Sequence, residues 1–279
     1  MSYVTARDGT RLHFAETLPA GTPHGPTILC LPGVTRTSRD FSRLATALAA
    51  DGHRVIALDY RGRGRSGRPL DAASYTPSVY IDDIRNVLCA LNLHRIVVVG
   101  TSLGGFLAMG MAIAMPTVLA GAVLNDSGPD LPTDGVARIA DYIADARGYA
   151  DWDAAVDAVR TMLPDLNLDE EGWRRAAEGC FREETDGTVQ ADWDPRIADP
   201  MRRAGALPDL WSMYRALRPI PTLAFRGELS SLLSEECFRR MKDVKPDLRQ
   251  TLIAGRGHAP TLDEPEARSA IHAFLATLR

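Results

Sequence analysis

The chain has 279 residues, of which 45% are hydrophobic and 24% are charged, as in an ordinary globular enzyme. This length suits one large α/β domain, or a core domain that carries an insertion, and allows a substantial buried core. The formal net charge of -4 gives no reason to expect nucleic acid or an anionic membrane as a partner.

The four cysteines lie far apart and form neither a C-x-x-C pair nor a metal-ligand spacing. The first residues lack an apolar stretch of signal-peptide type, and no apolar run is long enough to span a bilayer. We therefore expect a cytoplasmic protein that uses no metal ion or cofactor and acts on a small-molecule substrate. The sequence leaves open whether the chain forms a homo-oligomer.

Strand and helix patterns alternate over the first half of the chain. A hairpin is expected over residues 2–16, because two β-prone runs flank the tight-turn signal Asp8-Gly9. Apolar runs then predict strands and helically spaced apolar residues predict helices. The expected elements are strand 27–31, helix 39–50, strand 54–58, helix 76–91, strand 95–99, helix 103–115 and strand 119–124. This alternation predicts an α/β fold with a mostly parallel, doubly wound sheet.

The alternation stops between residues 128 and 218, where many charged residues occur at helix-like spacing. We interpret 128–218 as a helical cap inserted into a core domain made of residues 1–127 and 219–279. All four tryptophans lie in this stretch, namely Trp152, Trp173, Trp193 and Trp211. After it the alternation resumes with strand 222–226, helix 235–244, strand 250–253 and helix 265–278.

Residues 100–104, with the sequence GTSLG, match the G-x-S-x-G motif of nucleophilic serines. The match directly follows a predicted central strand and directly precedes a helix, which is the context that the motif requires. A sharp strand-to-helix turn would strain the backbone of Ser102 and present its hydroxyl beside free N–H groups of the helix, which can stabilise an oxyanion. The alternative is a Gly-Ser loop that merely joins the strand to the helix.

Four segments resemble, in order along the chain, the α/β-hydrolase superfamily. They are Leu31-Pro32-Gly33, residues 59–66 (DYRGRGRS), the serine motif and residues 257–260 (GHAP). The resemblance covers nearly the whole chain and is to the capped branch, with its lactonases, esterases, C–C bond hydrolases, haloalkane dehalogenases and epoxide hydrolases. The last two groups carry an aspartate where this chain has Ser102, so the serine resembles the ester, lactone and C–C hydrolases.

This resemblance implies a serine hydrolase that cleaves a carboxylic ester or lactone through an acyl-enzyme. A C–C bond hydrolase of a diketone-type product of aromatic breakdown is the first alternative, although those enzymes commonly have Trp where this chain has Ala259. A weakly active or non-catalytic relative that keeps the pocket is the second. Ser231 is the reason for this last alternative, because it stands where the family usually has its third catalytic residue, an aspartate.

His258 is the expected general base, because it alone of six histidines lies in the loop between the last strand and the last helix, where the family has its catalytic histidine. A surface histidine in a turn is the alternative. Two carboxylates could replace the acid missing at Ser231. Asp126 follows strand 119–124, as the acid does in haloalkane dehalogenases, and is favoured over Glu228 because strand-end geometry decides which carboxylate reaches the ring. A turn-capping role is the rival for Asp126.

By the resemblance, the oxyanion donors are the backbone N–H groups of Val34 and Leu103, and Gly33 leaves room for substrate. The cap is expected to roof the substrate pocket. Its candidate lining residues, besides Gly33 and Ala259, are Trp152, Trp211 and Trp173, with core packing as the alternative for each tryptophan.

Residues 61–68 (RGRGRSGR) contain a match to the dinucleotide-binding fingerprint. Pro69 and a polar loop follow it instead of the helix that this fingerprint must open, so we reject that interpretation. The four arginines are isolated in an acidic chain and do not indicate nucleic acid. We expect a solvated or salt-bridged loop.

Overall fold

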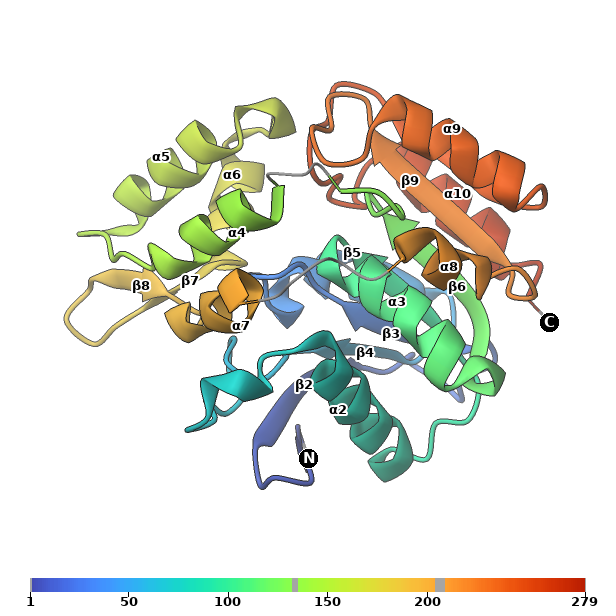
Figure 1. Ribbon diagram of the computed structural model, residues 1–279, viewed down its shortest axis with the longest axis horizontal. Coiled ribbons are helices and arrows are strands. Elements are labelled where there is room, and N and C mark those ends of the chain that lie inside the picture. The colour runs from blue at the N-terminus through green and yellow to red at the C-terminus, as the bar shows by residue number, and fades with distance from the viewer. Residues whose placement is uncertain (1, 132–134, 204–208, 279) are drawn as a thin grey trace.

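The computed structural model describes residues 2–131, 135–203 and 209–278 (Figure 1). An eight-stranded sheet forms its centre, in the order β1-β2-β4-β3-β5-β6-β9-β10. The strands are β1 (Tyr3–Thr5), β2 (Arg11–Thr17), β3 (Thr27–Leu31), β4 (Val55–Leu58), β5 (Ile96–Thr101), β6 (Leu119–Asn125), β9 (Thr222–Gly227) and β10 (Arg249–Ile253). All neighbouring strands from β4 to β10 pair in parallel, whereas β1 pairs with β2, and β2 with β4, in antiparallel orientation. The predicted mostly parallel α/β sheet and the N-terminal hairpin are confirmed.

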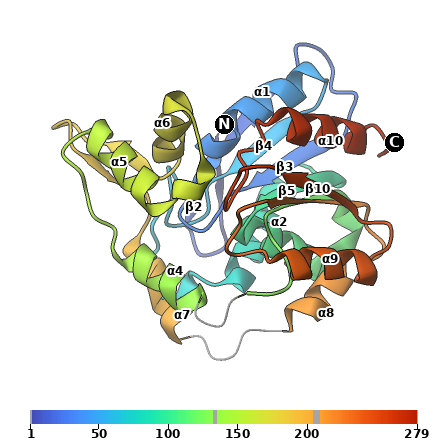
Figure 2. The same cartoon turned by 90° about the horizontal axis from the view of Figure 1, so that it is seen from above.

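Helices cover both faces of this sheet (Figures 1 and 2). Helices α1 (Ser42–Ala50) and α10 (Pro265–Leu275) pack on one face, and α2 (Pro77–Ala90), α3 (Leu103–Ala114) and α9 (Glu235–Val244) on the other. Along β5, Val97 and Val99 face the first layer, and Ile96 and Val98 face the second. A strand buried on both faces needs apolar residues at every position, which explains the continuous run in the sequence.

Helix boundaries differ slightly from the prediction. The expected helix 39–50 begins with a 3₁₀ turn, Ser38–Phe41, before α1, and the last helix ends at Leu275 instead of residue 278. Terminal turns are the least constrained part of a helix and often adopt 3₁₀ geometry. None of the described helices is long and apolar enough to cross a membrane.

Between β6 and β9 the chain forms helices and a hairpin that lie together on the left of Figure 1. These elements are α4 (Gly135–Ala144), α5 (Trp152–Met162), α6 (Glu170–Glu178), β7 (Phe181–Glu183), β8 (Val189–Ala191) and α7 (Ala198–Arg203). The expected helical insertion thus also contains a short hairpin, β7–β8, that the sequence did not indicate. Strands of three residues are too short to show a period of two, and their one local signal is the Asp186-Gly187 turn, where Gly187 has φ +85°.

Helix α8 (Leu210–Arg215) closes this stretch but packs against α3. The buried Tyr214 hydroxyl donates a hydrogen bond to the Met241 carbonyl of α9 at 3.0 Å. Helix α8 thus packs with the helix layer formed by α2, α3 and α9. The division of the chain at residues 128 and 218 stays a prediction.

Candidate active site

The turn between β5 and α3 forces Ser102 into an unusual backbone conformation, with φ 51° and ψ -112°. The turn is possible only because its neighbours lack side chains. A Cβ on Gly104 would lie 2.0 Å from the Leu31 carbonyl oxygen, and a Cβ on Gly100 would lie 2.3 Å from the Gly104 carbonyl group. The strained strand-to-helix elbow expected from the sequence is present, and it sets Ser102 immediately before the first residue of α3.

Residues Asn125 and Ser127, at the end of the neighbouring strand β6, fasten this elbow. The Ser102 N–H donates to the Asn125 carbonyl at 3.1 Å, and the Ser127 hydroxyl donates to the Ser102 carbonyl at 3.0 Å. The Asn125 side-chain amide donates both to Thr101 Oγ1, at 3.1 Å, and to the Pro260 carbonyl, at 2.8 Å. One buried amide therefore connects the residue before Ser102 to the loop that carries His258. Neither residue was predicted from the sequence to belong to the site, although both flank Asp126.

His258 and Asp126 are in direct contact, with His258 Nδ1 2.6 Å from Asp126 Oδ2. The Asp126 side chain is fully buried, and the His258 ring is 18% exposed. The carboxylate also accepts hydrogen bonds from the Gly227 N–H at 2.8 Å and from the Ser230 hydroxyl at 2.6 Å. Three donors thus surround one buried carboxylate, which fixes its orientation toward the imidazole.

The other carboxylate weighed from the sequence lies elsewhere. Glu228 is exposed, and its carboxylate accepts a hydrogen bond from the Gly255 N–H at 2.7 Å. Ser231 is exposed as well. The residue of this loop that enters the site is its buried neighbour Ser230, which donates to Asp126. The loop after β9 therefore supports the carboxylate that comes from β6.

The loop after β3 lies against the elbow. A Cβ on Gly33 would be 3.9 Å from Ser102 Cβ, which places Gly33 beside the serine. Within the described ranges, neither the Val34 N–H nor the Leu103 N–H donates a hydrogen bond to another protein group. Neither N–H is therefore taken up by a protein acceptor in the part of the chain that the structure describes. The Val34 carbonyl, in contrast, accepts a hydrogen bond from Arg63 Nε at 2.7 Å.

The Ser102 hydroxyl has no hydrogen bond to any residue in the described part of the chain, His258 included. The structure thus pairs the imidazole with Asp126 and leaves the serine hydroxyl unpaired. Hydrogen bonds of catalytic groups are often long in ligand-free enzymes and shorten when substrate binds. Among the described residues, no three His, Cys, Asp or Glu side chains form a cluster that could hold a metal ion.

The 3₁₀ turn Pro164–Leu166, which lies between β6 and β9 in the sequence, forms hydrogen bonds with the loop that carries His258. The Gly257 N–H donates to the Asp165 carbonyl at 2.7 Å, and Arg256 Nη1 donates to the Leu166 carbonyl at 2.8 Å. In return, the Asn167 amide donates to the Gly255 carbonyl at 2.7 Å. The position of the imidazole therefore depends on a segment far from it in the sequence.

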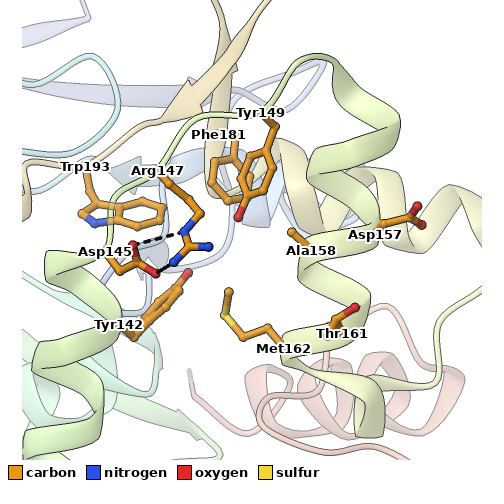
Figure 3. Close-up of a pocket in the computed structure, with 10 residues that line it drawn as sticks. All are labelled: Tyr142, Asp145, Arg147, Tyr149, Asp157, Ala158, Thr161, Met162, Phe181 and Trp193. Atoms are coloured by element: carbon orange, nitrogen blue, oxygen red, sulfur yellow. Dashed lines mark hydrogen bonds and ion pairs between the residues drawn. The ribbon is translucent and has the colours of Figure 1, made fainter.

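A cavity of about 410 Å³ lies inside the insertion (Figure 3). Aromatic rings from α4 and the hairpin region form one wall, with the Asp145–Arg147 ion pair among them, and α5 forms the other. The lining residues are Tyr142, Asp145, Arg147, Tyr149, Asp157, Ala158, Thr161, Met162, Phe181 and Trp193. Tyr142 also interacts with Thr35, the residue after Val34, so this wall reaches the loop beside Ser102. Ser102 and His258 do not border the cavity.

Trp193 lines this cavity, whereas the three candidates named from the sequence, Trp152, Trp173 and Trp211, do not. Trp152 donates its indole N–H to Glu183 at 2.8 Å and lies under Arg174, and Trp211 lies under Arg240. Trp173 is buried in the core, as the alternative for it supposed. The sequence could not separate the four tryptophans, because each suits an amphipathic helix or a hairpin equally well. Ala259, next to His258, is half-buried.

The fold and the elbow together define an α/β-hydrolase. The model of the alpha/beta hydrolase family matches residues 28–270, and the chain belongs to this family. The confirmed family also accounts for the order of the four segments recognised in the sequence.

Among curated proteins, the chain is 30% identical over 256 residues to a 3-hydroxybutyrate-oligomer hydrolase of Cupriavidus necator, covering 88% of this chain and 87% of that protein. Among solved structures, an alpha/beta hydrolase from Novosphingobium aromaticivorans superposes with a TM-score of 0.91 and 38% identity, covering 98% and 96% of the two chains. The structure of E-2-(acetamidomethylene)succinate hydrolase superposes with a TM-score of 0.83 and 25% identity, covering 99% and 98%.

Proposed function

We propose that this chain hydrolyses a carboxylic ester through an acyl-enzyme. Ser102 attacks the ester carbonyl, His258 takes the serine proton and returns it to the leaving alcohol, and the N–H groups of Val34 and Leu103 stabilise the oxyanion. Water, activated by the same imidazole, then releases the acid. The observation that carries the proposal is the 2.6 Å contact between His258 and the buried Asp126, beside the serine elbow.

Asp126 is the proposed acid of the triad. Its role would be to keep the proton on His258 Nδ1, so that Nε2 is free to accept the serine proton, and to stabilise the imidazolium that forms. Its burial and its three hydrogen-bond donors suit a carboxylate that stays charged and fixed. On this proposal a serine at position 231 does not prevent catalysis, because Asp126 at the end of β6 supplies the carboxylate instead.

An ester is the first substrate class to test, because the similar protein of C. necator is named as a hydrolase of 3-hydroxybutyrate oligomers. A small-molecule ester or lactone of a short hydroxy acid would satisfy the same chemistry. The reaction as proposed needs neither a metal ion nor a cofactor.

The test is hydrolysis of short p-nitrophenyl esters and of 3-hydroxybutyrate dimer ester, together with labelling of Ser102 by a fluorophosphonate. Wild type should turn over and be labelled, and Ser102→Ala should do neither. Labelling without ester turnover, with cleavage of a vinylogous diketone, would favour the C–C hydrolase. Failure of both labelling and turnover would leave a binding protein that only keeps the pocket.

A further inference from the structure

Arg63 is completely buried, contrary to the solvated or salt-bridged loop expected for residues 61–68. Its neighbour Arg61 is also buried, but pairs with Asp83 at 2.7 Å and with Asp8 at 2.6 Å. No described Asp or Glu side chain lies within ion-pairing distance of Arg63. The two arginines thus differ in kind, since Arg61 is neutralised and Arg63 is not.

Among the described residues, the groups that contact the Arg63 guanidinium directly are neutral. Nη1 donates to the Arg61 carbonyl at 2.9 Å and to the Tyr80 hydroxyl at 2.8 Å, and the ring centroids of Tyr60 and Tyr80 lie 5.5 and 5.0 Å away. Burial raises the pKa of Tyr60 well above its usual value, so this phenol stays neutral as well. Nη2 is buried and has no hydrogen-bond partner among the described residues. Burying a charged group without a counter-ion costs folding free energy, so we expect the buried Arg63 guanidinium to serve a function.

The remaining donor of Arg63 points to that function. Nε donates to the Val34 carbonyl at 2.7 Å, in the loop whose Gly33 lies beside Ser102. The Tyr60 hydroxyl holds the same loop by donating to the Pro32 carbonyl at 3.0 Å. No described residue accepts a hydrogen bond from the Val34 N–H. The guanidinium therefore fixes the orientation of the peptide groups around one of the two proposed oxyanion donors.

We propose that Arg63 is a positioning residue of the oxyanion hole, which orients Val34 and places an unneutralised positive charge behind the loop that receives the oxyanion. This proposal rests on the proposed hydrolase function. A fixed cation in a poorly solvated environment favours the negative tetrahedral intermediate over the neutral ester, so it should affect the chemical step more than substrate binding.

The test compares Arg63→Met and Arg63→Lys with Arg65→Met, whose arginine is exposed in the same loop. Arg63→Met should lower kcat about 10- to 100-fold and change KM less than about 3-fold, somewhat less than the loss of a direct oxyanion donor. Arg63→Lys, which keeps the charge, should lie between wild type and Arg63→Met. Arg65→Met should match wild type.

A second measurement separates positioning from a merely structural role. An alkyl boronic acid forms a B–O bond with the serine hydroxyl, whose proton passes to the histidine, and yields a tetrahedral boronate anion that resembles the intermediate. Arg63→Met should weaken boronate binding by the same factor as kcat and leave binding of the product alcohol unchanged. Equal weakening of both ligands would overturn the proposal, as would a folded variant with wild-type kcat.

If Arg63→Met does not fold, Arg63→Lys is judged by the same two criteria, with circular dichroism to verify its structure. Failure of the proposed function is distinguishable, because wild type itself would then show neither ester turnover nor labelling of Ser102. An active wild type whose Arg63 variants keep full kcat would refute only the role of Arg63.

Discussion

Replacing Asp126 by Asn tests the proposed triad most directly. The Asn side chain can keep the hydrogen bond from the Gly227 N–H through its oxygen, so the fold should survive. Its NH₂ group, however, would occupy the place of Oδ2, 2.6 Å from His258 Nδ1. A donor at that place forces Nδ1 to act as acceptor, which puts the proton on Nε2 and leaves no acceptor for the serine proton.

The magnitude follows from this change of tautomer. The same substitution in another serine-hydrolase triad lowers kcat by about 10⁴, equivalent to about 5.4 kcal/mol of lost transition-state stabilisation. We expect Asp126→Asn to lower kcat by about 10³ to 10⁴, with KM changed little. The assay is steady-state hydrolysis of a p-nitrophenyl ester, with circular dichroism to verify the fold.

Glu228→Gln is the matched control. Glu228 is exposed and contacts the Gly255 N–H through an oxygen that glutamine retains, so kcat should stay within about 3-fold of wild type. A greater loss of activity in Glu228→Gln than in Asp126→Asn would refute the role proposed for Asp126. So would a folded Asp126→Asn that keeps more than about a tenth of wild-type kcat.

Three further predictions concern stability and chemistry. Ser230→Ala removes a buried 2.6 Å hydrogen bond to the Asp126 carboxylate and should lower the free energy of unfolding, measured in urea, by about 1–3 kcal/mol. Ser231→Ala, at the exposed neighbouring residue, should change it by less than about 0.5 kcal/mol. Equal effects of the two substitutions would contradict the role assigned to Ser230. Burial would raise the pKa of Asp59, but hydrogen bonds from His13 and two backbone N–H groups outweigh it and lower the pKa. The charged carboxylate of Asp59 therefore stabilises the fold at pH values above its unfolded pKa of about 3.9. Urea unfolding at several pH values should show that the stability advantage of wild type over Asp59→Asn shrinks as the pH falls below about 4. An advantage that grew on acidification would refute this prediction. Ester hydrolysis should persist after dialysis against EDTA, and a loss restored by added metal would overturn the metal-free mechanism.

Several features could be predicted because their causes are local in the sequence. The strand 27–31 and the helix 235–244 have the predicted bounds, since apolar periodicity and turn residues mark both ends. The elbow at Ser102 was predictable for the same reason, because the glycines that allow its close backbone contacts lie within a few residues of it. The hairpin β7–β8 was missed, because three-residue strands carry too little periodicity to be recognised.

What the sequence by itself determined is the alternation of elements, the parallel sheet and the elbow, all of which follow from neighbouring residues. Only the tertiary structure decided which carboxylate meets His258, because Asp126 and Glu228 both follow strands and differ only in where the strand ends lie. The same holds for Arg63, whose motif reads as a surface loop but whose burial depends on packing against Tyr60 and Tyr80. Contacts between residues far apart in the chain depend on how the strands are ordered in space, and local sequence patterns do not encode that order.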